Sequence, residues 1–344
     1  MVAVVVVVGV VARAMEGNPM SASKKLRNTM IRFGMMNGLR PLTLGLALTV
    51  PMMSAAADQQ TFATPKAAVD ALITALRTNN DAALLAIMGE KHKELVVTGD
   101  PAADAVWRAH AVAQFETFNL LLERGDDHRV LLIGAEAWPV PIPLKRVDGS
   151  WRFATEEGVV ELLNRRIGQN ELNAISTLRA LLDAQRQYAA RDRDGDGVLA
   201  YAQKVMSTPG KHDGLYWPSD PAKDEEESPI GPLIAESSAY LVGHKAGDPY
   251  RGYRFRMLTG QGKNAAGGAY SYIINGRMIG GFAMVAFPDA YGEDGVMTFI
   301  VNHNGKVFEK NLGKDTASVG GKMTVFDPGT GWKEVSTELP GSPQ

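Results

Sequence analysis

The stretch from residue 170 to residue 197 constrains the fold of this chain most, because an amphipathic helix runs directly into a loop of alternating aspartates. Apolar residues recur there at steps of three and four, which is the spacing of one helical face. They are Leu172, Ile175, Leu178 and Leu182. The pattern predicts a core helix of about five turns with Asn170 as its N-cap. The residues expected to face water are Arg179, Gln185, Arg186 and Gln187.

The loop after this helix has the first half of an EF-hand calcium loop. In such a loop, side-chain oxygens at positions 1, 3 and 5 converge on one cation, and position 7 offers a backbone carbonyl. These positions are Asp192, Asp194, Asp196 and Val198, and Gly197 allows the sharp turn at position 6. Three aspartates so close together repel one another unless a positive charge neutralises them. The pattern therefore favours a bound Ca²⁺.

The second half of the loop departs from the EF-hand pattern. Position 9 is Ala200, which has no side-chain oxygen, and position 12 is Gln203 in place of the bidentate glutamate. We therefore expect a calcium site weaker than that of a sensor protein, with Gln203 supplying one neutral oxygen. The alternative is a solvated acidic turn that binds no metal.

The first 57 residues have the order of a secretory signal and are excluded from the fold. Basic residues precede an apolar run at 41–53, and three alanines ending at Ala57 follow it. We expect cleavage near Ala57, which gives a periplasmic or secreted chain. The apolar run is too short to span a bilayer comfortably, so the mature protein is not expected to be an integral membrane protein. Met30 and Met35 are alternative starts, in which case the valine-rich opening is upstream sequence.

Composition narrows the possible functions. The chain has no cysteine, which excludes disulfides, thiolate metal sites and a cysteine nucleophile. Removing residues 1–57 takes away six of the 36 basic and one of the 38 acidic residues, so the remainder has a formal net charge of −7. That charge disfavours nucleic acid as a partner. A length of 344 residues suggests two domains, which we place at 58–167 and 168–330, with a tail at 331–344.

Helices come before strands in the first domain. A cap at Thr64 starts one helix, a short helix opens at Asp81, and a third covers 105–123. Strands are expected at 129–133, 140–146 and 150–154, the last two joined by a tight Asp148-Gly149 turn. This order is similar to the cone-shaped NTF2-like fold. Such cones often hold a pocket for a small ligand or, in some enzymes, a His–Asp pair, and His110 and His128 fall in this domain.

The second domain is expected to be a sheet built from hairpins. Its strand candidates are 253–257, 269–274, 277–287, 296–301 and 306–311. The pairs Asn275-Gly276 and Asn304-Gly305 predict tight turns. The central strands are apolar on both faces, so the sheet needs two covers. We expect the long helix to supply one, and residues 207–249 or the first domain to supply the other. Short helices are expected at 200–206 and 234–244, and the acidic stretch 220–227 is expected to be mobile.

Two resemblances follow from these segments. The helix "LRALLDAQRQYAARD" and the strands "GYRFRMLTG", "GGFAMVAFP" and "GVMTFIVNHNGKVFEKNLG" resemble the head domains of type IV pilins and type II secretion pseudopilins. A soluble domain stands where pilins carry their apolar helix, so polymerisation as a pilus does not carry over. Over nearly all of 58–330 the chain resembles an exported bacterial family known as domain of unknown function 2950. That resemblance implies a two-part exported protein and no established activity.

We therefore expect an α+β protein with an NTF2-like domain followed by a pilin-head-like domain. Its expected function is that of a non-enzymatic binding or assembly module of the cell envelope, with envelope or secretion-system proteins as partners. The alternative is a hydrolase-type or small-ligand-binding enzyme that uses the pocket of the first domain, or the pair His212 and Asp213 beside Trp217.

Overall fold

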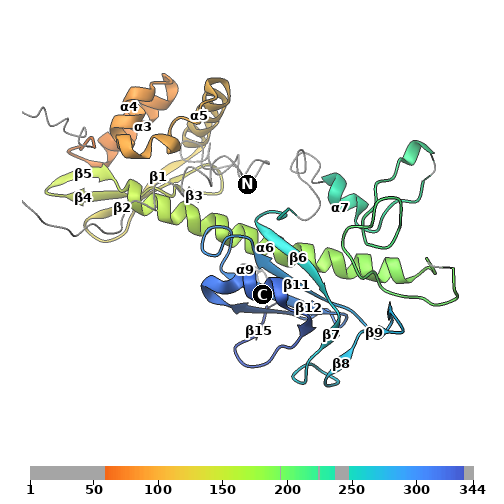
Figure 1. Cartoon of the computed structure of the whole chain (residues 1–344). Helices are drawn as coiled ribbons and strands as arrows, with labels where there is room; N and C mark the ends of the chain where they lie inside the picture. The colour runs from red at the N-terminus through yellow and green to blue at the C-terminus, as the bar shows by residue number, and fades with distance from the viewer. Residues whose placement is uncertain (1–58, 194, 224, 237–247, 337–344) are drawn as a thin grey trace, which may run out of the picture. The chain divides into compact units, whose positions relative to one another are not determined.

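The computed structural model describes residues 59–193, 195–223, 225–236 and 248–336 (Figure 1). The expected signal segment, the expected metal ligand Asp194 and most of the helix expected at 234–244 lie outside these residues. The chain divides into two compact units between Leu162 and Leu163, inside the same helix that contains the expected domain boundary. Each unit combines helices with antiparallel strands, so the chain is α+β.

Capping side chains mark the first turn of the α-helices in the first unit. The helices are α3 (Pro65–Arg77), α4 (Asp81–Met88), the 3-10 turn η1 (Glu90–Leu95) and α5 (Pro101–Thr117). Thr64, Asn80 and Asp100 each accept a hydrogen bond from a backbone N–H in the first turn of α3, α4 and α5 respectively. The expected starts at Thr64 and Asp81 are confirmed.

The sheet of the first unit is antiparallel and has the order β1-β2-β4-β5, with β3 paired to β2. Its strands are β1 (Asn119–Glu123), β2 (His128–Ile133), β3 (Trp138–Pro139), β4 (Leu144–Val147) and β5 (Ser150–Phe153). The expected helix at 105–123 is wrong at its end, because Phe118 is extended and the leucines after it pair with β2. The turn at Asp148-Gly149 is confirmed, with positive φ at both residues.

Helix α6 (Thr155–Ala189) is longer than the sequence predicts, and Asn170 does not cap it. Asn170 lies in mid-helix, where its side chain donates to the carbonyl of Asp294 at 2.9 Å. The carboxylate of Glu171 accepts the backbone N–H groups of Val296 and Met297, each at 2.9 Å. Two polar side chains that resemble a helix start thus bind the loop between two strands of the sheet.

The buried face of α6 in the second unit differs in part from the predicted face. Leu178 and Leu182 are buried as expected, but Leu172 is 52% exposed. Gln185, which was expected to face water, is fully buried. The face that packs on the sheet consists of Ala174, Leu178, Leu181, Leu182, Ala184, Gln185 and Tyr188.

The main sheet of the second unit has the strand order β15-β13-β12-β11-β6. Its strands are β6 (Tyr253–Leu258), β11 (Ala283–Pro288), β12 (Met297–Asn302), β13 (Val307–Asn311) and β15 (Lys333–Glu334). Smaller elements are β7 (Gly260–Gln261), β8 (Tyr270–Ser271), β9 (Ile273–Ile274), β10 (Arg277–Met278), β14 (Val325–Phe326), η2 (Pro221–Lys223), α7 (Gly231–Glu236), η3 (Gly313–Asp315) and α9 (Thr316–Lys322). The turn at Asn275-Gly276 joins β9 to β10, as expected.

Two different helices cover the two faces of this sheet. Met257 faces α6, because its sulfur lies 3.4 Å from the amide nitrogen of Gln185. Phe287 and Arg256 point to the opposite face, where α9 and β14 pack. A Cβ on Gly320 of α9 would lie 2.5 Å from the ring of Phe287, so only glycine permits this approach. The α6 cover is confirmed, whereas α9 is a cover that the sequence pattern did not predict.

Candidate functional site

A pocket of about 360 Å³ lies in the second unit at the C-terminal end of α6. Side chains from three places in the chain line it: the end of α6 with the loop after it, the segment 200–213, and the β9–β10 turn. The lining residues used below are Tyr188, Arg193, Tyr201, Lys204, Asp213, Asn275 and Arg277. The volume is within the range of about 300–1,000 Å³ that is typical of small-molecule sites.

A buried glutamine fixes the segment that forms one side of the pocket. The amide nitrogen of Gln185 donates to the carbonyl of Ala202 at 2.8 Å, and its oxygen accepts the N–H of Ala202 at 2.9 Å. The next backbone contact is between Tyr201 and Met278 of β10, at 2.8 Å. The helix expected at 200–206 is therefore wrong, because Tyr201 and Met206 form extended bridges to other segments.

The loop at 192–198 borders the pocket, and its residues Asp192 and Asp196 bind other groups of the protein. The carboxylate of Asp192 accepts the N–H groups of Gly195 and Gly197 at 2.8 and 2.7 Å. Asp196 accepts the N–H of Val198 at 3.0 Å with one oxygen and pairs with Arg277 of β10 through the other. A guanidinium therefore already supplies one positive charge to the loop.

The calcium ligands expected from the sequence are brought together only in part. Val198 lines the pocket, and Gln203 donates its amide N–H to the carbonyl of Gly276 at 2.8 Å. Within the described ranges, which omit Asp194, no three acidic or histidine side chains are grouped closely enough to hold a metal ion. Since one of the three aspartates lies outside that part of the chain, calcium binding by this loop stays a prediction.

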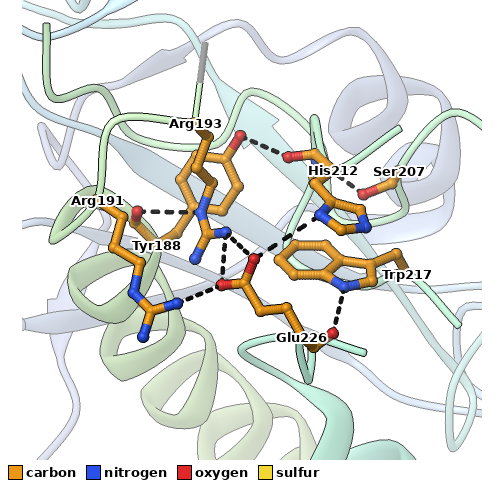
Figure 2. Close-up of polar contacts among 8 residues, drawn as sticks. Tyr188, Arg191, Arg193, Ser207, His212, Trp217 and Glu226 are labelled. Atoms are coloured by element: carbon orange, nitrogen blue, oxygen red, sulfur yellow. Dashed lines mark hydrogen bonds and ion pairs between the residues drawn. The ribbon is translucent and has the colours of Figure 1, made fainter. Parts of the chain in front are cut away.

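Arg193 is the centre of a stack of aromatic and charged side chains beside the pocket (Figure 2). Its guanidinium lies 4.7 Å from the ring centroid of Tyr188 and 5.1 Å from that of Trp217, distances at which cation–π attraction operates. Its Nη1 donates to both carboxylate oxygens of Glu226, at 2.9 and 3.0 Å. His212 stacks on Trp217 with ring centroids 4.2 Å apart.

Glu226 makes two further contacts at this stack. Its carboxylate also accepts from Arg191 at 2.9 Å, and its backbone carbonyl accepts the indole N–H of Trp217 at 2.8 Å. Burial raises the pKa of Glu226, but the hydrogen bond and charge of Arg193, with Arg191 and His212, outweigh burial and hold that pKa below its usual value. Glu226 lies in the stretch 220–227, whose expected mobility stays a prediction.

A second ion pair lies on the pocket wall. Lys204 donates to the carboxylate of Asp213 and to the hydroxyl of Thr208, both at 2.8 Å. Asp213 also accepts the backbone N–H of Thr208 at 2.7 Å and its hydroxyl at 2.9 Å. The hydrogen bond from Lys204 and those from Thr208 hold the pKa of Asp213 far below its usual value.

The candidate catalytic pair His212 and Asp213 does not form. His212 faces Trp217 and Glu226, whereas Asp213 turns to Lys204 and Thr208. Arg193 was not predicted as a site residue because it stands between two aspartates of the expected calcium loop. The one signal in the sequence was the presence of Trp217, an aromatic side chain of the kind on which arginine stacks.

His110 and His128 belong to the first unit. The Nδ1 of His128 lies 2.9 Å from a carboxylate oxygen of Asp127, and its Nε2 lies 3.7 Å from Glu157. Glu157 also pairs with Lys145 at 3.0 Å, so His128 belongs to a cluster of four charged or ionisable groups. His110 is half-buried on α5.

The fold and the pocket define an α+β protein of two compact units with a polar cavity in the second. The chain belongs to the family described as "Protein of unknown function (DUF2950)", whose model matches residues 59–335. No curated protein and no solved structure matches the chain. In the part of the chain that the structure describes, we find no helix with the length and apolarity needed to cross a membrane.

Proposed function

We propose that this protein is exported, to the periplasm or out of the cell, and acts there by binding rather than by catalysis. The observation that carries the proposal is the pairing of charges around the pocket. Arg193 with Glu226, Lys204 with Asp213 and Arg277 with Asp196 are ion pairs that hold the pocket walls in place. Side chains held in this way position a ligand, and their charges are committed to structural partners.

The proposed architecture is a ligand-binding cone followed by a pilin-head-like module. In support, the first unit has helices followed by an antiparallel sheet, and the second has α6 packed along an antiparallel sheet. The proposed partners are proteins of the envelope or of a secretion system. Nucleic acid is not among them, since the formal net charge of the chain is negative.

Cell fractionation and a ligand screen test the proposal together. We expect the expressed chain to be recovered from the periplasm or the medium with its N-terminus near Asp58. We also expect small polar molecules to raise its melting temperature without being consumed. Recovery of full-length chain from the cytoplasm would contradict the export part, and turnover of a bound compound would contradict the binding part.

Weak calcium binding by Asp192, Asp194, Asp196, Val198 and Gln203 is a further part of the proposal. We expect millimolar Ca²⁺ to raise the melting temperature, and we expect the substitution Asp194→Asn to abolish the rise. Lys306→Ala, which changes a distant surface residue, serves as the control. No rise in the unchanged chain would remove the ion from the proposed function.

The alternative function is that of a hydrolase-type or small-ligand-binding enzyme using the first unit. The 2.9 Å contact between His128 and Asp127 is the observation that favours it, because a carboxylate on Nδ1 orients an imidazole for proton transfer. A screen of hydrolase substrates, repeated with His128→Ala and with His110→Ala, tests it. If activity is found and is lost only in His128→Ala, the function is catalysis and not binding.

A further inference from the structure

Cationic side chains outnumber anionic ones among the residues that line the pocket. Three cationic side chains, Arg193, Lys204 and Arg277, line the pocket with one anionic side chain, Asp213. The whole chain has a formal net charge of −2. Each of these cations is paired with an acidic side chain, so attraction for an anion has to come from N–H donors that Arg193 and Lys204 keep beyond their ion pairs.

The acidic groups at the pocket have little capacity left for a ligand. Asp213 already accepts three hydrogen bonds, from Lys204 and from the N–H and hydroxyl of Thr208. Glu226 accepts from Arg191 and twice from Arg193. A cationic ligand would therefore have to displace protein donors from these carboxylates.

The cationic groups, in contrast, keep donors that are not used. A lysine ammonium has three N–H donors, and Lys204 gives two of them to Thr208 and Asp213. The Nε of Arg193 donates to the carbonyl of Tyr188 at 3.3 Å, and its Nη1 donates to Glu226. Among the residues that the structure describes, Nη2 of Arg193 makes no hydrogen bond, and Figure 2 draws it without a dashed line.

Neutral polar groups and ring surfaces complete the wall. Tyr201 and Asn275 line the pocket, and within the described chain neither the hydroxyl of Tyr201 nor the amide of Asn275 makes a hydrogen bond. The ring of Tyr201 packs against Phe282 at 4.7 Å and is held there. Such groups suit the hydroxyls and apolar edges of an organic molecule better than a bare ion.

We propose that this pocket binds a small organic anion, whose carboxylate or phosphate group is held by Nη2 of Arg193 and Nζ of Lys204. The proposal rests on the proposed binding function and adds the chemical class of the ligand. Nη2 of Arg193 offers N–H donors on a delocalised cation and Lys204 offers a point charge, and both kinds of group bind carboxylates and phosphates. The hydroxyl of Tyr201 and the amide of Asn275 bind the remainder of the ligand.

Matched ligand pairs test the charge requirement on the full mature chain. Calorimetric titration compares galacturonate with galactose, and glucose 6-phosphate with glucose, at low ionic strength. We expect the charged member of at least one pair to bind at least about tenfold more tightly than the neutral member, as hydrogen bonds to charged groups predict. Whether the acid or the phosphate is preferred identifies the source of the negative charge. Added NaCl weakens that binding, because the side chain of Lys204 is exposed to solvent.

Two substitutions test the residues. Lys204→Gln removes the ammonium and Tyr201→Phe removes only a hydroxyl, and each is expected to weaken binding of the charged ligand. Lys306→Gln is the matched control, since Lys306 is an exposed lysine paired with Glu334 at 3.0 Å outside the pocket. Circular dichroism spectra and melting curves of the three variants establish that each is folded.

The outcomes separate this inference from the proposed function. Equal binding of neutral and charged members, unchanged binding in Lys204→Gln, or no binding of any of the four probes at millimolar concentration overturns the anion site. The first of these results leaves a binding module in place. Recovery of the chain from the cytoplasm overturns the proposed export and leaves the anion site standing.

Discussion

At the scale of single residues, replacement of Gln185 is expected to cause a large loss of stability for a side chain of its size. It is fully buried and pairs through both ends of its amide with the backbone of Ala202. Gln185→Ala leaves that N–H and that carbonyl buried without partners, at about 1–3 kcal/mol for each group. We expect a loss of about 2–6 kcal/mol in the free energy of unfolding, measured by urea denaturation.

The neighbouring residue Gln187 is the control for this prediction. It lies on the exposed side of the same helix turn, so Gln187→Ala should change the free energy of unfolding by less than about 0.5 kcal/mol. Equal effects of the two substitutions would show that the amide pair contributes nothing to stability.

The ion pairs of Glu226 lead to a prediction of how the stability of the protein depends on pH. Its folded-state pKa lies below its usual value, so folding favours the ionised carboxylate that Arg193 and Arg191 hold. The contribution is complete above the pKa of the unfolded chain, near 4.3 for a glutamate, and is lost as the pH falls through the folded-state value. Glu226→Gln should therefore lower the melting temperature at pH 7 and flatten its decline between about pH 5 and pH 3.

Glu227→Gln provides the matched control, because Glu227 is the exposed next residue. Melting curves across the pH range should superpose for Glu227→Gln and the unchanged chain. A decline in Glu226→Gln as steep as in the unchanged chain would assign the acid sensitivity to other carboxylates. Glu156 is one of them, since its hydrogen bond with Lys91 lowers its pKa to about 2.

Sequence patterns could not predict these residue-scale contacts. Gln185 interrupts an apolar stripe with a polar side chain, and such a residue is normally placed in water. It bonds to the backbone of Ala202, which lies in an extended segment. That segment is extended because Tyr201 pairs with Met278. Asn170 and Glu171 resemble a helix start for the same reason: their partners, Asp294 and Met297, lie far away in the sequence.

At the scale of elements, two glycines of α6 have opposite roles. A Cβ on Gly158 would lie 2.4 Å from the side chain of Ile142, whereas a Cβ on Gly168 would meet nothing within 4 Å. Gly158→Ala should destabilise the protein by about 1–3 kcal/mol through overpacking. Gly168→Ala should stabilise it by up to about 1 kcal/mol, because alanine favours the helix.

Thermal unfolding of the two single variants measures this difference in sign. Stabilisation by both substitutions would mean that Ile142 moves away from α6 at little cost. Destabilisation by both would mean that α6 is less regular at Gly168 than its helical geometry implies.

Elements with local signals could be predicted, and elements fixed by distant partners could not. Tight turns at Asp148-Gly149 and Asn275-Gly276 depend on residues that adopt positive φ, so a dipeptide is enough. The strand β6 follows from the alternation of apolar residues with Arg254 and Arg256, and β11 and β12 follow from apolar runs of the right length. The start of α6 fifteen residues early and the strand at 119–123 depend on packing with other segments, which overrides local preference.

At the scale of the whole molecule, the chain has two separate buried cores. One includes Leu84, Leu144 and Phe153 of the first unit, and the other includes Leu178, Tyr253 and Val285 of the second. Helix α6 contributes to both cores. Leu162 belongs to the first core, and Ala174 is the first residue of the helix that belongs to the second. In this described stretch, the eleven residues between them add no buried apolar side chain to either core.

That arrangement predicts two unfolding transitions. Polar contacts such as those of Asn170 and Glu171 hold this stretch, but it adds no apolar side chain to either core. A helix of about eleven residues is marginally stable in water by itself, so we expect the stretch to couple the two cores weakly. Leu84 and Leu178 are both fully buried, one in each core. Cutting either to alanine should cost about 2–5 kcal/mol, and the cost should fall on one unit only. Differential scanning calorimetry should then show that Leu84→Ala lowers one melting transition and that Leu178→Ala lowers the other. If both substitutions lower a single common transition by similar amounts, α6 transmits stability between the cores and the two units unfold as one.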